Sequence, residues 1–183
     1  MNSRESIEKM DINIFKIGGN VINSERGLDL FLDDFSKTGG YKILVHSGGK
    51  IATDISKRLG IEVTMITGKR VTDAEILKVV TMVYAGLVNK TIVANLVVRQ
   101  CLALGVCGAD FNLVPSSIKP EEDGVDYGYV GLIKKNEVNS DFLLNCLKQK
   151  IVPVFSSILH DEKGTLLNVN DILDPSAGTI ITS

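Results

Sequence analysis

Two hydrophobic periods alternate along the chain. Short runs of mainly branched apolar residues, typical of buried parallel strands, occupy residues 12–15, 42–46 and 151–155. Between them lie stretches in which apolar residues recur every three or four positions, as they do on one face of an amphipathic helix. Strands that alternate with helices in this way predict an α/β fold. We expect a three-layer αβα sandwich with a mainly parallel central sheet.

Cap and breaker residues set the expected ends of the first helices. Ser24 can cap a helix that ends at the Gly39-Gly40 pair. A second helix follows Gly49 and stops at Gly60, and a strand near residues 62–66 comes after it.

A long helix is expected in the middle of the chain. Thr72 and Glu75 have the spacing of a capping box with the threonine as N-cap. The helix that this box opens should run from Ala74 to about Leu104, with a break near Gly86 and Asn89. Its apolar residues cover more of the circumference than packing on one sheet requires. This extra apolar surface favours a homodimer contact, with Val83 on the outward part of the apolar stripe. The alternative is a helix buried deeply within its own domain.

The second half of the chain adds two turn-rich segments. Residues 113–118 and 127–133 flank a charged turn at 120–124, which predicts a β-hairpin with an exposed tip, and a turn at 161–164 predicts another hairpin. Ser140 can cap a short helix between them. Because no linker or repeat divides the chain, we expect residues 1–183 to form a single domain.

Composition and charge exclude several classes of protein. The net charge of -2, with 20 scattered basic residues, argues against a nucleic-acid partner. No apolar run approaches the ~20 residues needed to span a bilayer, and residues 1–6 lack the apolar region of a signal peptide. We therefore expect no membrane partner and a cytoplasmic location.

The cysteines and histidines offer little catalytic chemistry. Cys101, Cys107 and Cys146 are odd in number and lack metal-ligand spacing, so we expect buried free thiols and no metal site. The two histidines are His46 and His160. His46 ends a predicted strand, where a packed and hydrogen-bonded ring is expected more than a proton carrier.

Two glycine turns carry the strongest chemical signal. Lys16-Ile17-Gly18-Gly19 and His46-Ser47-Gly48-Gly49 each follow an apolar strand. Glycine lets backbone N–H groups approach an anion closely, and a helix that starts just beyond adds the positive end of its dipole. Turns at the ends of neighbouring strands would form one phosphate-handling site, with Lys16 as a mobile positive charge. For each turn alone, a plain tight turn is the simpler explanation.

Five segments in order resemble the amino-acid kinase family and, within it, the acetylglutamate kinases of arginine biosynthesis. They are residues 16–19, similar to K-x-G-G; 44–49, similar to L-V-H-G-G-G; 68–73, similar to G-x-R-V-T-D; 79–90, similar to the helix pair of the family's dimer contact; and 167–170, similar to Y-N-V-N-A-D. The resemblance covers Ile14 to about Asn170.

The resemblance implies transfer of the γ-phosphate of ATP, with Mg²⁺ expected, to the side-chain carboxylate of N-acetyl-L-glutamate or N-succinyl-L-glutamate. It makes Lys16 catalytic and places Lys16, Gly18 and Gly19 on the nucleotide phosphates. Because a carboxylate is already ionised at neutral pH, such a transfer needs positive charge and N–H donors rather than a general base.

The resemblance also implies a substrate-binding set and a homodimer. The set comprises the second glycine turn, the arginine of the third segment, which would hold the α-carboxylate, and the asparagine of the last: Ser47, Gly48, Gly49, Arg70 and Asn168. Related kinases of carbamate or uridylate fit the third and last segments less well.

Three departures from the family pattern qualify these expectations. Ser47 stands where the family usually has a glycine, and Asp171 follows Asn170 without the intervening alanine. The sequence ends at Ser183, where the family continues into a nucleotide-binding half. We therefore expect the amino-acid-binding and dimerisation lobe of a kinase without most of the ATP lobe. The alternative is a non-catalytic module that binds an acyl amino acid or dimerises.

Overall fold

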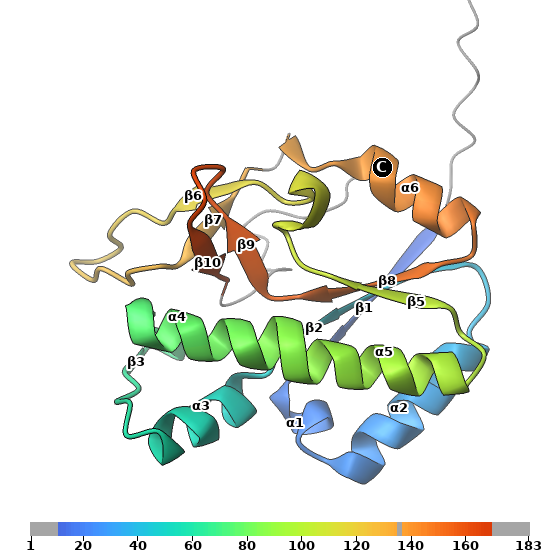
Figure 1. Cartoon of the computed structure of the whole chain (residues 1–183), viewed down its shortest axis with the longest axis horizontal. Coiled ribbons are helices and arrows are strands. Elements are labelled where there is room, and N and C mark those ends of the chain that lie inside the picture. The colour runs from blue at the N-terminus through green and yellow to red at the C-terminus, as the bar shows by residue number, and fades with distance from the viewer. Residues whose placement is uncertain (1–10, 135–136, 170–183) are drawn as a thin grey trace, which may run out of the picture.

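A four-stranded parallel sheet lies at the centre of the computed structural model, which describes residues 11–134 and 137–169. The strands lie side by side in the order β1 (Ile12–Ile17), β2 (Tyr41–His46), β8 (Val152–Ser156) and β5 (Ala103–Val106) (Figure 1). Every neighbouring pair is parallel. The predicted α/β fold with a parallel central sheet is confirmed.

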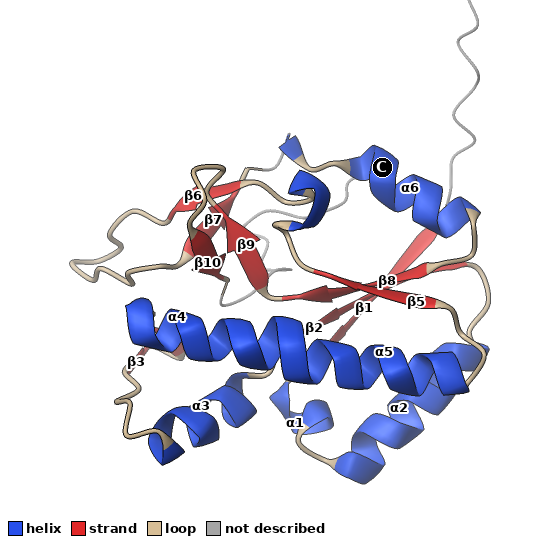
Figure 2. Ribbon diagram, in the orientation of Figure 1, coloured by secondary structure: helices blue, strands red, loops and turns tan. Residues whose placement is uncertain are grey.

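Helices and hairpins cover the two faces of this sheet, as Figure 2 shows. On one face, Leu44 and Val154 pack against α1 (Gly19–Ile22), α2 (Glu25–Lys37), α3 (Gly49–Arg58) and a long central helix. On the other face, Ile43 and Phe155 pack against α6 (Ser140–Lys148) and the hairpins. Successive strand residues thus enter two separate cores, which is the alternation expected of a sheet buried on both sides.

The long central helix consists of three continuous segments, α4 (Ala74–Thr81), the π-helix η1 (Met82–Val88) and α5 (Asn89–Val98). The predicted break near Gly86 is wrong, because a π-helical stretch absorbs the irregularity without interrupting the helix. The predicted end near Leu104 is also wrong. The chain turns at Gln100, which has a φ of 59°, and Ala103–Val106 leaves the helix to pair with β8 as strand β5.

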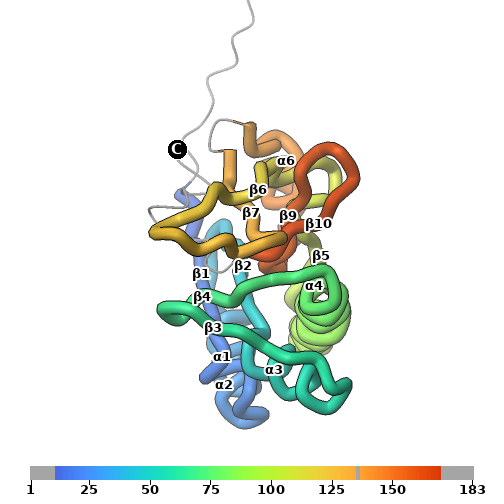
Figure 3. The backbone as a smooth tube through the Cα atoms, turned by 90° about the vertical axis from the view of Figure 1, so that its left-hand side faces the viewer, coloured from blue at the N-terminus to red at the C-terminus, as the bar shows by residue number. Residues whose placement is uncertain are grey.

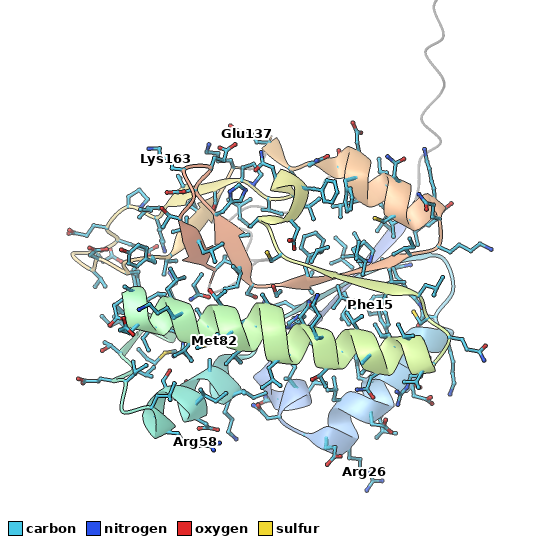
Figure 4. The ribbon with its side chains drawn as sticks, in the orientation of Figure 1. Phe15, Arg26, Arg58, Met82, Glu137 and Lys163 are labelled. Atoms are coloured by element: carbon cyan, nitrogen blue, oxygen red, sulfur yellow. The ribbon has the colours of Figure 1, made fainter. Side chains whose placement is uncertain are left out.

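The central helix has one buried and one exposed side. By length and composition alone, Ala74–Val98 could cross a membrane, contrary to the prediction that no apolar stretch approaches that length. Its inner side packs against the sheet in the first core, which is the arrangement of a core helix in a globular domain. Val83 lies on this inner side with 3% exposure, so its predicted outward position is wrong, whereas Met82 and Leu87 are more than half exposed. Met82 is marked on the central helix in Figure 4.

Antiparallel hairpins complete the fold, and Figure 3 shows them around the end of α4. The two predicted hairpins are confirmed as β6 (Ser116–Ile118) with β7 (Gly131–Ile133), and β9 (Ile158–His160) with β10 (Leu166–Asn168). Another hairpin joins β3 (Met65–Ile66) to β4 (Lys69–Arg70). The strand expected near residues 62–66 is therefore a short hairpin arm outside the central sheet. A 3₁₀ turn, η2 (Asp110–Asn112), precedes β6.

The first predicted helix cap is confirmed, because the Ser24 side chain accepts a hydrogen bond from the N–H of Gly27 at 3.0 Å. The capping box is wrong by one residue. Asp73 is the N-cap of α4 and accepts from the N–H of Ile76 at 2.8 Å. This assignment leaves the Thr72 hydroxyl available for a contact with a distant part of the chain.

Two smaller predictions also need correction. Asn139, rather than Ser140, caps α6. All three cysteines are free thiols, but Cys146 alone is buried, and Cys101 and Cys107 are half-buried.

Candidate functional site

The two glycine turns lie side by side at the carboxyl ends of β1 and β2. Ile17 pairs with His46 in the parallel register, and the Ser47 N–H donates to the carbonyl of Ile17 at 3.4 Å. Beyond the turns, a Cβ built on Gly19 would stand 4.0 Å from the Cβ of Lys50. The expected proximity of the turns follows directly from the pairing of their strands.

The second turn presses against the central helix. A Cβ added at Gly48 would lie 2.9 Å from Cδ1 of Tyr84 and 3.2 Å from Cγ2 of Val88. No real side chain tolerates the first of these distances, so only glycine lets the turn approach the helix this closely. Gly48 is also the N-cap of α3, where the first N–H groups of the helix have no partner within the helix.

The first turn has a different character. Gly18 has no atom within 4 Å of a built Cβ, so open space adjoins it, and it caps the four-residue helix α1. Lys16 lies on an exposed position of β1, two residues before this cap. An exposed lysine next to an open glycine turn is suited to bind a mobile anion at the surface.

Arg70 joins the third predicted segment to the second glycine turn. Arg70 is buried, with 3% of its surface exposed. Its Nη2 donates to the carbonyl of Gly49 at 2.9 Å and to Oγ1 of Thr53 at 2.8 Å. These bonds tie the β3–β4 hairpin to the first turn of α3. They bring a guanidinium to the place where the helix N-terminus already favours an anion.

Asn168 joins the last predicted segment to the same region. Its Nδ2 donates to Oγ1 of Thr72 at 3.1 Å, across 96 residues of sequence. Its Oδ1 is buried and has no hydrogen-bond partner among residues 11–134 and 137–169. A buried acceptor without a donor costs about 1–3 kcal/mol, which makes this oxygen a natural contact for a ligand N–H group.

His46 is a packed residue, as predicted. Its ring is fully buried, with Nδ1 3.2 Å from the carbonyl of Ser47 and Nε2 3.0 Å from Nδ2 of Asn89. Burial lowers the pKa of His46 to about 4. The neutral ring can donate from Nδ1 to the carbonyl of Ser47 and accept at Nε2 from the amide of Asn89, so it holds the half-buried Ser47 in place and carries no positive charge at neutral pH.

Two residues near Arg70 were not identified as site residues from the sequence. Thr53 is one helical turn beyond Gly49, and only its contact with Arg70 distinguishes it. Tyr84 has 4% exposure, and burial raises the pKa of its hydroxyl, while the positive charge of the nearby Arg70 and hydrogen bonding toward it oppose the shift. In the sequence, Tyr84 is one of many apolar positions on the central helix. It lies in the π-helical segment η1, which no local sequence pattern indicates.

Other features lie away from this cluster or outside the described residues. One cavity of about 510 Å³ lies between α2 and α5, and another of about 550 Å³ lies at the opposite end of the sheet, beside Lys42. The part of the chain that the structure describes holds no group of three histidine, cysteine or acidic side chains that could bind a metal ion. Asn170 and Asp171 fall outside the described residues.

Sequence comparison relates the chain to a family of known proteins. The family model described as "Amino acid kinase family" matches residues 11–171. Acetylglutamate kinase from Cytophaga hutchinsonii is 52% identical over 157 residues, which are 86% of this chain and 59% of that protein. Acetylglutamate kinase from Phocaeicola vulgatus is 50% identical over 162 residues, 88% of this chain and 62% of that protein. The chain thus spans about three-fifths of the length of these curated relatives.

Solved structures share the fold at low sequence identity. The N-acetylglutamate synthase of Neisseria gonorrhoeae, in complex with coenzyme A and N-acetyl-glutamate, has a TM-score of 0.74 at 20% identity, over 90% of this chain and 37% of that one. A protein of Streptococcus mutans has a TM-score of 0.73 at 23% identity, over 86% of this chain and 63% of that one.

Proposed function

Because this chain belongs to the amino acid kinase family, we propose that it forms the amino-acid-binding lobe of an ATP-dependent kinase that phosphorylates the side-chain carboxylate of an N-acyl-L-glutamate. Acetylglutamate kinases at 50–52% identity support this reaction class. One observation carries the proposal. Arg70 bonds to Gly49 and Thr53 in the first turn of α3. Asn168, from the other end of the sequence, bonds to Thr72, two residues after Arg70.

The proposed ligand matches the donors and acceptors of this cluster. The Arg70 guanidinium is suited to the α-carboxylate, because it is positively charged and has N–H donors besides the Nη2 group that is bonded to Gly49 and Thr53. The acyl amide N–H, which is the only N–H donor of an N-acyl-glutamate, is suited to the buried Oδ1 of Asn168. The side-chain carboxylate would then approach Gly48 and Gly49 at the N-terminus of α3.

Phosphoryl transfer between two anions requires positive charge and N–H donors more than a proton carrier. We assign the nucleotide phosphates to Lys16 and to the backbone N–H groups of Gly18 and Gly19, because this exposed turn leaves room for them. Mg²⁺, expected with the nucleotide, finds no cluster of three protein ligands among the described residues, so we assign it no protein site.

The acyl group distinguishes two substrates within this proposal. We favour N-acetyl-L-glutamate, with N-succinyl-L-glutamate as the second candidate. Ser47, in place of the family's glycine, adds a half-buried hydroxyl at the turn. Calorimetric titration of the 183-residue chain with both ligands, and with L-glutamate, tests the proposal. We expect binding of an N-acyl ligand at millimolar concentration and much weaker binding of L-glutamate, which lacks the amide. If neither N-acyl ligand binds, the proposal is wrong.

We also propose that two copies of the chain associate through the outer side of the central helix. Met82, Leu87 and Val98 are each more than half exposed there. Each Å² of apolar surface that a partner covers contributes about 25 cal/mol. A second copy would supply a self-complementary apolar surface, as an isologous contact requires.

A second candidate function is a non-catalytic module that binds the acyl amino acid or dimerises. A coupled ADP-release assay with ATP, Mg²⁺ and the N-acyl-glutamate that binds separates the two functions. Turnover by this chain would exclude the module, whereas tight binding without ADP release would favour it.

A further inference from the structure

Tyr84 occupies an unusual place for a core aromatic residue. It lies in η1, where the central helix changes to π-helical hydrogen bonding for seven residues. Such segments are rare and occur frequently at functional sites, because the wider turn redirects the side chains that it carries. In this chain, Val83 and Tyr84 are both buried, and the ring of Tyr84 faces the second glycine turn.

The ring of Tyr84 supports the backbone of that turn. A Cβ built on Gly48 would stand 2.9 Å from Cδ1 and 3.2 Å from Cε1 of the ring. The ring therefore lies as close to the Gly48 backbone as the absence of a side chain allows. Because Tyr84 is buried on a helix that packs against the sheet, this contact fixes the turn from its inner side.

The hydroxyl of Tyr84 and the guanidinium of Arg70 both lie beside the next residue, Gly49. The Cβ position of Gly49 lies 3.8 Å from the Tyr84 hydroxyl oxygen and 3.9 Å from Nη2 of Arg70. The same Nη2 donates to Gly49 and to Thr53. Both groups therefore lie beside Gly49, where the tyrosine hydroxyl offers the buried arginine a further acceptor beyond the two on α3.

We propose that Tyr84 is a positioning residue that sets both the Gly48-Gly49 turn and the Arg70 guanidinium in the arrangement that receives the ligand's carboxylates. This inference rests on the proposed binding of an N-acyl-glutamate. Tyr84 acts through Arg70 and the turn, and the ligand itself is bound by those groups. Preorganisation of this kind strengthens binding, because a group that is already held in place loses less freedom when the ligand arrives.

Tyr84→Phe tests the role of the hydroxyl while the ring keeps its packing against Gly48. We expect the dissociation constant for N-acetyl-L-glutamate, or for the N-succinyl ligand if that one binds better, to rise about 5- to 20-fold. The urea unfolding midpoint should stay near that of the unmodified chain. Tyr41→Phe removes a hydroxyl at the opposite end of β2 and should leave the affinity unchanged.

A double-mutant cycle with Arg70→Lys shows whether the hydroxyl acts through the arginine. Lysine keeps the charge but has no fork for the tyrosine to orient. In that background, Tyr84→Phe should change the dissociation constant by less than about twofold. A purely structural tyrosine would instead give the same loss in both backgrounds. Tyr84→Met, which also lacks the hydroxyl, provides a second variant and should show at least the loss of Tyr84→Phe.

The outcomes separate this inference from the proposed function. If the unmodified chain binds the ligand and Tyr84→Phe binds it equally well, the positioning role is wrong and the proposed function stands. Additive losses in the cycle would also overturn the role. If the unmodified chain binds neither N-acyl-glutamate, the proposed function fails, and the positioning role fails with it.

Discussion

Replacing Arg70 by alanine removes the group on which the proposed recognition depends. The side chain is almost buried, and its Nη2 donates two hydrogen bonds of 2.9 and 2.8 Å to Gly49 and Thr53. Hydrogen bonds to charged groups contribute about 1.5–3 kcal/mol, and loss of one partner from a buried charge pair costs about 2–5 kcal/mol. We expect N-acyl-glutamate binding to weaken by roughly 2 to 4 kcal/mol. The dissociation constant should therefore rise roughly 30- to 900-fold.

The same substitution should lower the stability of the unliganded chain by about 1–3 kcal/mol, because the hairpin loses its link to α3. Calorimetry at several protein concentrations measures the affinity, and urea unfolding measures the stability. Arg58→Ala is the matched control, since Arg58 is an exposed arginine at the end of the same helix, labelled in Figure 4. An Arg70→Ala affinity within twofold of that control would refute the assignment of Arg70 to a carboxylate.

Three further predictions concern catalysis, assembly and acid stability. Lys16→Ala should leave N-acyl-glutamate affinity within about twofold while it reduces ADP release, since its charge acts on the phosphoryl group; an equal loss of binding and turnover would contradict this division. Leu87→Glu should convert the proposed dimer into a folded monomer in light scattering, whereas Val83→Glu should unfold the chain because Val83 is in the core; a monomeric unmodified chain would refute the dimer. The pKa of His46 is lowered to about 4 in the folded chain, against an ordinary 6.5. As the pH falls, the unfolded chain therefore takes up a proton on this ring at a higher pH than the folded chain does. Stability should thus fall by about 3 kcal/mol as the pH drops from 6.5 to 4, and His46→Gln should show a smaller fall in urea unfolding.

The sequence predicts the features that neighbouring residues determine. Each glycine turn is visible because an apolar strand directly precedes it, and the pairing of β1 with β2 then places the turns together. The Ser24 cap is likewise local, and the two predicted hairpins each join strands that are neighbours in the sequence.

Features that depend on distant partners were mispredicted or missed. The apolar pattern of the central helix continues without a gap into Ala103–Val106, and only pairing with β8, about 50 residues later, makes that segment a strand. The inward position of Val83 agrees with helical spacing, because Val83 lies four residues after Val79 and three after Val80, which are both buried. The wide apolar stripe obscured which side faces the core, and the contact of Tyr84 with Gly48 could not be inferred from spacing at all. The cap of α4 shifts to Asp73, while Thr72 bonds to Asn168.

The candidate site shows the same division between local and distant information. Lys16, the glycines, Arg70 and Asn168 were identified on their motifs, and the structure adds the bonds that join Arg70 to α3. The unpartnered Oδ1 of Asn168 could not be predicted, because its environment is assembled from segments 96 residues apart. The ligand roles of these residues stay predictions.

A structure of the chain with bound N-acetyl-L-glutamate tests the central claim most directly. We predict that the α-carboxylate lies within about 3 Å of the Arg70 guanidinium and that the acyl N–H donates to Oδ1 of Asn168. The side-chain carboxylate should face Gly48 and Gly49. A ligand seated instead in the cavity between α2 and α5, or in the cavity beside Lys42, would contradict the account.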